Sequence, residues 1–529
     1  MTVTKIWDDS LSNDERSVPD VSISTSKPSK NPLGYTITYH GNGLTFADGS
    51  SENEIIVNSS GKILSGSFKL PDGLFAGWYS DKTCTKRVET DSNGLPVDGL
   101  VSDMDLYAKT KTFVLKKGSD FNKLISSTAT SVIFTDETMP TSATLIDADA
   151  DGDEGVVAWM DGTVMKVSTQ TPGKQVIADT NCYQMFASKK NLISIDFSNL
   201  NTNNITVMSS MFDGCRGLVS LDLTPLDTQN VTYMNGMFNN CNSLTNLDLT
   251  PLDTQNVINI HSMFSGCSGL TNLDLTPLDT HKVTNMAYMF DDCRGLTNLD
   301  LTPLDTSNVT NMNSMFYGCN GLTSLDLTPL NTQSVTSMSS MFYGCSGLTS
   351  LDLTPLNTQN VTYMSYMFRG CSGLTSLDLT PLDTQNVTNM ASMFYGCSGL
   401  TNLDLTPLDT SKVINMNGMF SGCNGLTNLD LTPLDTQNVT NMGFMFSDCS
   451  GLTNLDLTPL DTQNVTDMNY MFYGCTALTN LSLGEKFAFV GSNYQLPSGT
   501  WYSSNGTAYN SDGKTCTIPN NKSDTYTRR

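Results

Sequence analysis

The stretch NVTNMNSMFYGCNGLTSLDLTPLNTQ, residues 308–333, recurs with small changes along more than half of the chain. Its cysteine marks the period, because it returns every 26 residues without an insertion. A fixed period of this length is typical of solenoids, in which stacked units bury one continuous core. The cysteines of the repeat are Cys215, Cys241, Cys267, Cys293, Cys319, Cys345, Cys371, Cys397, Cys423, Cys449 and Cys475.

Two apolar patterns share each unit. Leu221 and Leu223 alternate with polar residues, as in a short strand, and Pro225 then ends the strand. The next apolar residues have a spacing that predicts one face of a helix of about three turns: Val231, Met234, Met237, Phe238 and Cys241. We therefore predict an α/β solenoid, a leucine-rich-repeat array of twelve strand–helix units over residues 185–483, with a parallel sheet about 50 Å long.

The repeat resembles the BspA-like family of bacterial leucine-rich-repeat surface proteins. The matching motifs are the L-x-x-L-D-L strand, as in Leu244–Leu249, and N-V-T-x-M-x-x-M-F-x-G-C, as in Asn308–Cys319. Lys282 and Asp292 depart from the second motif, where Asn and Gly are usual. The resemblance covers about 300 residues, and it implies adhesion to host matrix proteins or to other bacteria.

The N-terminal third lacks the 26-residue period. Residues 34–111 contain Tyr35–Tyr39, the turn Gly41–Gly43, Phe75–Tyr79 and Leu106–Ala108, in an order that resembles the Listeria–Bacteroides repeat, a small β-rich module. Within residues 1–33, Val3–Asp9 resembles the first strand of a Cna protein B-type domain, and a Ser/Pro/Lys-rich linker follows. If the latter resemblance holds, the chain is the tail of a longer secreted protein.

Two further segments are expected to close the ends of the solenoid. Residues 112–184 form a β-rich bridging segment, in which Asp161-Gly162 is a good hairpin turn. Residues 484–529 form a C-terminal β-rich cap, needed because the last unit would otherwise expose its core.

The chain carries a net charge of −24. Residues 192–482 contain 24 acidic and five basic residues and therefore account for most of this charge. This balance argues against nucleic acid and anionic membranes as partners. No signal peptide and no run of 18 apolar residues is present. Taken with the resemblances, we expect a cell-surface or secreted protein whose partners are host extracellular-matrix or bacterial surface proteins.

An aspartate recurs between the inward-pointing leucines and should form an acidic ladder on the concave face of the sheet. We interpret it as a solvated face, with a cation or a cationic ligand as the alternative. The ladder comprises Asp196, Asp222, Asp248, Asp274, Asp300, Asp326, Asp352, Asp378, Asp404, Asp430 and Asp456. A second position, Asp227 and its equivalents, alternates between Asp and Asn, as in turns that bond their own backbone.

Three positions of the predicted helix vary while their neighbours hardly change, and Tyr, Ser, Gly and Asn dominate them. This composition is typical of adaptable protein-binding surfaces, although drifting exposed positions would look similar. The ligand-binding candidates are Tyr288, Tyr317, Tyr343, Tyr366, Tyr395, Phe444, Tyr470 and Tyr473.

The cysteines are interpreted as small buried thiols, because no C-x-x-C pair is present and His40, His261 and His281 are not placed to complete metal sites. The acidic run Asp147, Asp149, Asp151 and Asp153 begins like a calcium loop, but Ala158 stands where a bidentate Glu is needed. We therefore expect no cofactor, with calcium as a weak alternative.

No nucleophile–base pair or phosphate loop is found, so we expect a protein that is not an enzyme. The predicted function is surface adhesion or protein binding through the solenoid. The alternatives are a structural spacer or self-associating surface element without a dedicated ligand, and an adhesin of a phage or virion.

Overall fold

The computed structural model describes residues 34–71 and 74–529, so the resemblance of residues 3–21 to a Cna-type strand lies outside the described residues. The chain divides into two compact units. The first contains residues 34–112 together with 153–155, and the second contains residues 113–152 and 156–529. No helix in the described part of the chain is both long and apolar enough to cross a bilayer.

The first unit is a six-stranded sheet in the order β3-β2-β1-β6-β4-β5. Its core is aromatic, because the inward-facing residue Tyr39 packs at 4.8 Å against Trp78. The strands are β1 (Tyr35–His40), β2 (Glu52–Val57), β3 (Ile63–Ser65), β4 (Phe75–Tyr79), β5 (Arg87–Val88) and β6 (Met104–Thr110). The alternation in Tyr35–Tyr39 thus corresponds to a strand buried on one face.

The second unit begins with a segment that covers the first coil of the solenoid. The hairpin of β9 and β10 turns at Gly162, as Asp161-Gly162 predicts, and β7 pairs in parallel with β12, the first leucine segment. Its elements are α1 (Gly118–Leu124), β7 (Ser131–Thr135), β8 (Ile146–Asp147), β9 (Val157–Asp161), β10 (Val164–Ser168), β11 (Val176–Ile177), β12 (Ser194–Asp196) and β13 (Leu200–Asn201).

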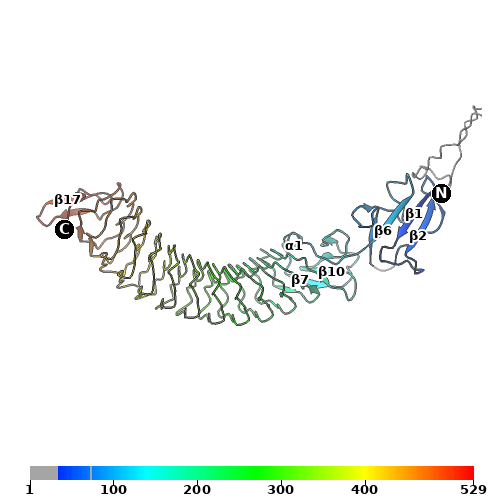
Figure 1. Cartoon of the computed structure of the whole chain (residues 1–529), viewed down its shortest axis with the longest axis horizontal. Helices are drawn as coiled ribbons and strands as arrows, with labels where there is room; N and C mark the ends of the chain where they lie inside the picture. Colours follow the sequence, from blue (N-terminus) through cyan, green and yellow to red (C-terminus); the bar gives the residue numbers. More distant parts are fainter. Residues whose placement is uncertain (1–33, 72–73) are drawn as a thin grey trace, which may run out of the picture. The chain divides into compact units, whose positions relative to one another are not determined.

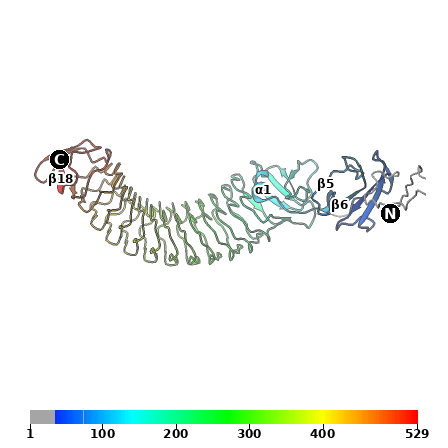
Figure 2. The ribbon, with the colours of Figure 1, turned by 45° about the horizontal axis from the view of Figure 1, so that its top comes forward.

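The repeats form a solenoid of coils that stack in a single curved row, drawn from cyan-green to orange (Figures 1 and 2). Each coil has a leucine face, defined as the L-x-x-L-x-L segment, here Leu218–Leu223. The other side of the coil is a turn wall, defined as residues 233–240 and their equivalents at 26-residue intervals. On the leucine face the leucines are buried and the aspartates between them are exposed.

The predicted parallel sheet of twelve leucine strands does not form along the array: two leucine strands pair with each other only at the C-terminal end, and at the N-terminal end β12 pairs with β7. The leucine segments of the central coils run side by side with few backbone hydrogen bonds, among them Thr245 N to Val219 O at 3.3 Å. At the C-terminal end, β14 (Asn454–Leu457) and β15 (Asn480–Leu483) pair in parallel and continue into a five-stranded sheet. Its other strands are β16 (Gly499–Tyr502), β17 (Ala508–Ser511) and β18 (Asp524–Arg528).

Hydrogen bonds between coils concentrate on the turn wall. The N–H groups of Met234, Gly236, Phe238 and Asn240 donate to carbonyls of the next coil at 2.6–3.2 Å. The residues between them bond within the coil, for example Met237 N to the carbonyl of Met234. The N–H groups of Met234 and Gly236–Asn240 are therefore satisfied either by a tight turn or by the neighbouring coil.

The prediction of a three-turn helix in each unit is wrong. An α-helix needs i to i−4 hydrogen bonds and negative φ at every residue. Here the bonds inside the coil span three residues, and Gly236 and Asn240 have φ of +62° and +55°. Overlapping turns also return to one side every third residue or so, which explains why the apolar spacing imitates a helix. Among the described residues, α1 is the single α-helix, and it lies before the repeats.

The core between the two walls is built from side-chain columns that run through the coils. Phenylalanine rings stack along the array, from Phe186–Phe212 at 5.7 Å to Phe446–Phe472 at 6.3 Å between centroids. Each repeat cysteine donates its thiol to a phenylalanine carbonyl, as Cys345 Sγ does to Phe316 O at 3.0 Å. Neighbouring coils therefore contact each other in the same way throughout.

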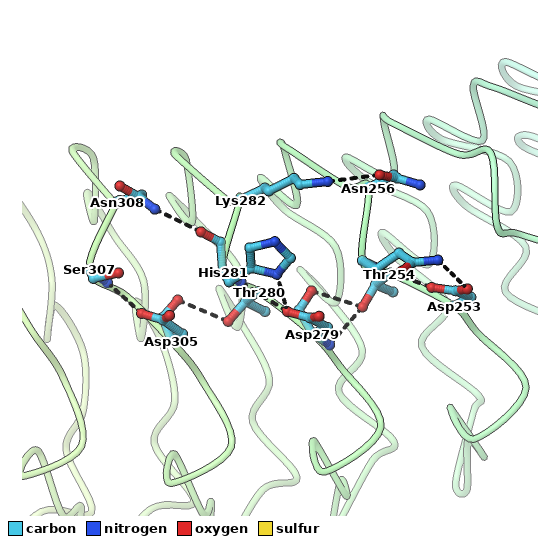
Figure 3. Close-up of polar contacts among 11 residues, drawn as sticks. Asp253, Thr254, Asn256, Asp279, Thr280, His281, Lys282, Asp305, Ser307 and Asn308 are labelled. Atoms are coloured by element: carbon cyan, nitrogen blue, oxygen red, sulfur yellow. Dashed lines mark hydrogen bonds and ion pairs between the residues drawn. The ribbon is translucent and has the colours of Figure 1, made fainter.

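A buried threonine joins each pair of coils (Figure 3). The hydroxyl of Thr254 donates to the carbonyl of Asp279 at 2.9 Å and accepts the N–H of the same residue at 2.8 Å. Thr280 repeats the first of these bonds with Asp305. Beside this ladder, Asn308 donates to the carbonyl of His281, and Lys282, which replaces an asparagine, donates to Asn256 at 2.8 Å.

Candidate functional site

The turn wall carries three columns of side chains on its outer side. The first column contains Tyr233 and its equivalents, which form parallel bridges from coil to coil. The second contains Gly236 and its equivalents, and the third contains Asn239 and its equivalents, which follow the buried phenylalanine. Because equivalent residues lie on adjacent coils, substitutions 26 residues apart become neighbours on this surface.

The second column holds large side chains in an unfavourable backbone conformation. Its residues have φ between +52° and +63°, which suits Gly and costs other L-residues roughly 1–2 kcal/mol. Most coils place Gly or a small Ser here, and Ser314 and Ser392 are almost fully buried. Four coils instead place an aromatic ring that remains 36–39% exposed: Tyr288, Tyr366, Phe444 and Tyr470.

The third column brings tyrosines and an arginine together in the middle of the array. Tyr317 and Tyr343 stack at 4.3 Å between ring centroids. In the next coil the Arg369 guanidinium lies over the rings of Tyr343 and Tyr395, at 5.3 and 4.0 Å. Tyr366 of the second column lies 5.6 Å from the same guanidinium. Together these residues form one continuous patch drawn from four coils.

The predicted ligand-binding residues thus fall into three groups on one wall. Four belong to the patch around Arg369, namely Tyr317, Tyr343, Tyr366 and Tyr395. Phe444 and Tyr470 stack at 4.9 Å, and Tyr473 contacts Tyr470 edge-on. Tyr288 packs against His261 at 5.3 Å.

Two residues of the coil that holds Tyr366 are missing from the sequence-based candidates. Tyr363, in the first column, is 51% exposed and belongs to the same coil as Tyr366 and Arg369. Their spacing of three residues is the signal that could have found them, because overlapping turns place such residues on one side of the wall. Arg369 stands in the third column, at the position where the neighbouring coils carry Tyr343 and Tyr395.

The aspartates of the ladder on the leucine face stabilise the turns that follow them. Asp326 Oδ1 accepts the N–H of Thr328 at 2.9 Å, and the same bond recurs along the array, so each carboxylate closes its own turn. These bonds lower the pKa of Asp326, with the Thr328 backbone N–H as the main cause. The neighbouring side chains leave open grooves between coils, such as one of about 480 Å³ lined by Leu247, Asp248 and Asp274.

The second aspartate position is also structural, as predicted. Asp227 Oδ1 accepts the N–H of Gln229 at 3.1 Å, and Asn331 makes the same bond to Gln333. The interpretation of the cysteines as buried thiols is likewise confirmed, because all eleven in the repeat are free and buried. Burial raises the pKa of the Cys345 thiol to about 12, which leaves it unreactive at neutral pH.

The acidic run after β8 brings carboxylate oxygens of Asp149, Asp151 and Asp153 within 4.8 Å of one another. Asp147 instead forms an ion pair with Lys116 at 3.0 Å, and Asp153 one with Lys109 at 3.4 Å. Asp153 also accepts the N–H groups of Thr112 and Gly155. Lysine and backbone donors therefore supply much of the positive charge that calcium would bring to this loop.

Asp291, in the third column beside Tyr317, has a side-chain carboxyl group with a raised pKa. Burial is the main cause that raises its pKa from about 4 to about 6, and the carboxylate of Asp292 adds to it. Ser265 donates to Asp291 at 3.2 Å and opposes the shift. The raised pKa means that the folded chain binds this proton more tightly than the unfolded chain, so the stabilisation is present below about pH 4 and is lost as the pH rises through 6.

Replacing Asp291 with Asn is therefore expected to stabilise the chain at pH 7.5 and to have no effect near pH 4. The shift corresponds to at most roughly 3 kcal/mol, and partial exposure reduces the expected gain to about 1 kcal/mol. Urea denaturation at the two pH values measures the difference. Asp326→Asn is the control, and it should give no gain at pH 7.5, because the pKa of Asp326 is lowered. An equal gain of Asp291→Asn at both pH values would contradict titration as the cause.

The stacked coils, the buried leucine segments and the surface columns define a leucine-rich-repeat-like solenoid, a class of repeat protein. The chain belongs to the family described as "Mycoplasma protein of unknown function, DUF285", whose model matches three tandem stretches, residues 180–299, 284–402 and 369–485.

Among solved structures, the chain is similar to one titled "Crystal structure of TLR13-ssRNA13 complex", with 15% identity and a TM-score of 0.14. That match covers 61% of this chain and 59% of the other, so the chain spans about three fifths of that structure's length. No curated protein matches the chain.

Proposed function

We propose that this chain is a non-enzymatic surface adhesion module, related to BspA-like proteins, that binds a partner protein through the turn wall of its solenoid. The observation that carries the proposal is the second column. Four coils hold an exposed aromatic ring at positive φ, where other coils place Gly or Ser. A strained position that carries a large exposed side chain is a common mark of a binding surface.

The composition of the wall supports the same proposal. Tyrosine and arginine dominate the energetics of many protein interfaces, because they bury large areas and still satisfy hydrogen bonds. In contrast, the aspartates of the leucine face are already engaged by their own turns. We further propose that residues 34–111 form a Listeria–Bacteroides-type module and that the solenoid acts on a cell surface or in a secreted protein; the six-stranded sheet of this segment supports a β-rich module. Host extracellular-matrix or bacterial surface proteins are the proposed partners.

Changing Tyr288, Tyr366, Phe444 and Tyr470 together to Ser is expected to weaken binding to the partner at least tenfold while thermal stability stays nearly the same. Five other coils carry Ser at this position with the same positive φ, and the four rings are exposed, so the substitutions leave the backbone and the core intact. The measurement is binding of the purified chain to a panel of extracellular-matrix and bacterial surface proteins by biolayer interferometry, with unfolding followed in parallel.

The matched control removes charge from the leucine face and keeps its turns. Asn can cap the turn as Asp does, so Asp326→Asn, Asp352→Asn and Asp378→Asn together should leave binding unchanged. If this control abolishes binding and the aromatic variant does not, the ligand site moves to the aspartate ladder. Absence of saturable binding across the panel would favour the structural spacer instead.

A further inference from the structure

We propose that the patch around Arg369 captures a single side-chain carboxylate, from an Asp or Glu exposed on a neutral or basic partner protein. The proposal rests on the turn wall being the binding surface, and it names the chemistry of the partner there. The patch consists of Arg369 with the tyrosines at 317, 343, 366 and 395, and Tyr363 belongs to the same coil as Arg369.

The first step of the argument is the geometry of the guanidinium. Tyr343 belongs to the coil before Arg369 and Tyr395 to the coil after it, and the guanidinium lies over both rings. The rings thus hold the guanidinium from two neighbouring coils, and its N–H groups make no hydrogen bond or ion pair to the described residues, so they remain for a ligand. A guanidinium edge matches the two oxygens of a carboxylate, which it can bind with two parallel hydrogen bonds.

The second step is that this cation has no acidic partner in the described chain. No described carboxylate lies within ion-pair distance of Arg369, whereas Arg294, elsewhere in the solenoid, pairs with Asp292 at 3.0 Å. Lys282 and Lys412 of the solenoid donate to asparagines of the preceding coil. Arg369 is therefore a half-buried, oriented donor that the fold itself does not use.

The third step is the tyrosines, which prepare the site. Stacking fixes Tyr317 and Tyr343 to each other, and the cation–π contacts fix the arginine between rings, so little side-chain freedom remains to be lost on binding. Tyr366 lies 5.6 Å from the guanidinium and is 38% exposed, and Tyr363 of the same coil, three residues earlier on the turn wall, is 51% exposed. They can cover the carboxylate from water, which strengthens the ion pair.

The charge of the surroundings selects the partner. Across wall residues 207–474, Arg369 is the one basic residue, against Asp213, Asp291, Asp292, Asp448 and Asp467. A polyanion such as an acidic polysaccharide would meet these carboxylates on both sides of its contact with Arg369. A second copy of the chain, with its net charge of −24, would be repelled in the same way. One carboxylate on a neutral or basic protein surface satisfies the arginine without this repulsion.

The test uses the full chain and peptides selected from a random displayed library for binding to it. We expect the recovered peptides to share one Asp or Glu beside an apolar or aromatic residue. Changing that Glu to Gln in the synthetic peptide should weaken its affinity at least tenfold for the parent chain and leave it unchanged for Arg369→Gln. Arg369→Lys should recover only part of the affinity, because an ammonium lacks the two-pronged edge.

Arg294→Gln is the matched control, since it removes the same charge from the solenoid and should not change peptide affinity. Recovered peptides without an acidic residue, an unchanged affinity for Arg369→Gln, or equal binding of hyaluronan would each overturn the inference. If the four second-column Ser substitutions abolish binding of the partner protein while Arg369→Gln does not, the turn wall stands as the binding surface and only the carboxylate site fails.

Discussion

Phe342→Ala is expected to lower the free energy of unfolding by about 3–5 kcal/mol, because it opens a cavity in the continuous phenylalanine stack. The Phe342 ring is fully buried and lies 5.9 Å from both Phe316 and Phe368. Each coil contacts only its neighbours, so the loss falls on the two interfaces of one central coil. Urea denaturation followed by circular dichroism should therefore show unfolding that splits into two transitions.

The control for this prediction is Phe444→Ala. That ring is 39% exposed on the turn wall, and its removal should cost less than about 1 kcal/mol. If Phe342→Ala unfolds in a single cooperative transition and loses no more free energy of unfolding than Phe444→Ala, the phenylalanine stack does not hold neighbouring coils together.

The second large effect is expected for Thr332→Val. The Thr332 hydroxyl donates to the carbonyl of Asn357 at 3.0 Å and accepts the N–H of the same residue at 2.7 Å. Valine has the same shape without the hydroxyl, so both backbone groups lose their partner in a buried position, which costs about 2–3 kcal/mol. The free energy of unfolding from urea titration measures the loss.

Two variants separate this effect from a general response to valine. Thr332→Ser keeps the hydroxyl and should retain most of the stability. Thr349→Val makes the identical change at an exposed threonine and should fall within about 0.5 kcal/mol of the parent. If all three variants are equally stable, the coils do not depend on the threonine ladder.

The core of the solenoid could be predicted from the sequence, whereas the backbone of the turn wall could not. Leucine, phenylalanine and cysteine columns follow directly from the 26-residue period, because equivalent residues of stacked coils must meet. The helix was wrong because turns of three residues give Met234, Met237 and Cys241 nearly the same spacing as a helix. The position before each cysteine carried a signal against a helix. It is Gly in most coils and Asn240, Asp292 or Asp448 in the others, and Gly, Asn and Asp are the residues that most readily adopt a left-handed backbone conformation.

The candidate surface shows a similar division. The sequence placed most of the exposed aromatic residues correctly on one surface, since spacing by 26 residues makes them neighbours. It could not show that Arg369 lies between Tyr343 and Tyr395, because that depends on side-chain conformations across three coils. Nor could it separate the aspartates that close turns from carboxylates free to bind a cation, because both are exposed acids in the same motif.

The uniform joints between coils also bear on how the gene for this chain can change. Any coil can follow any other, since the threonine, cysteine and phenylalanine contacts are the same at every joint. Recombination between near-identical repeats can therefore delete or duplicate a multiple of 26 codons and still yield a foldable product. Such events would lengthen or shorten the array, and would shift the Arg369 patch nearer to one end, without a new fold having to evolve.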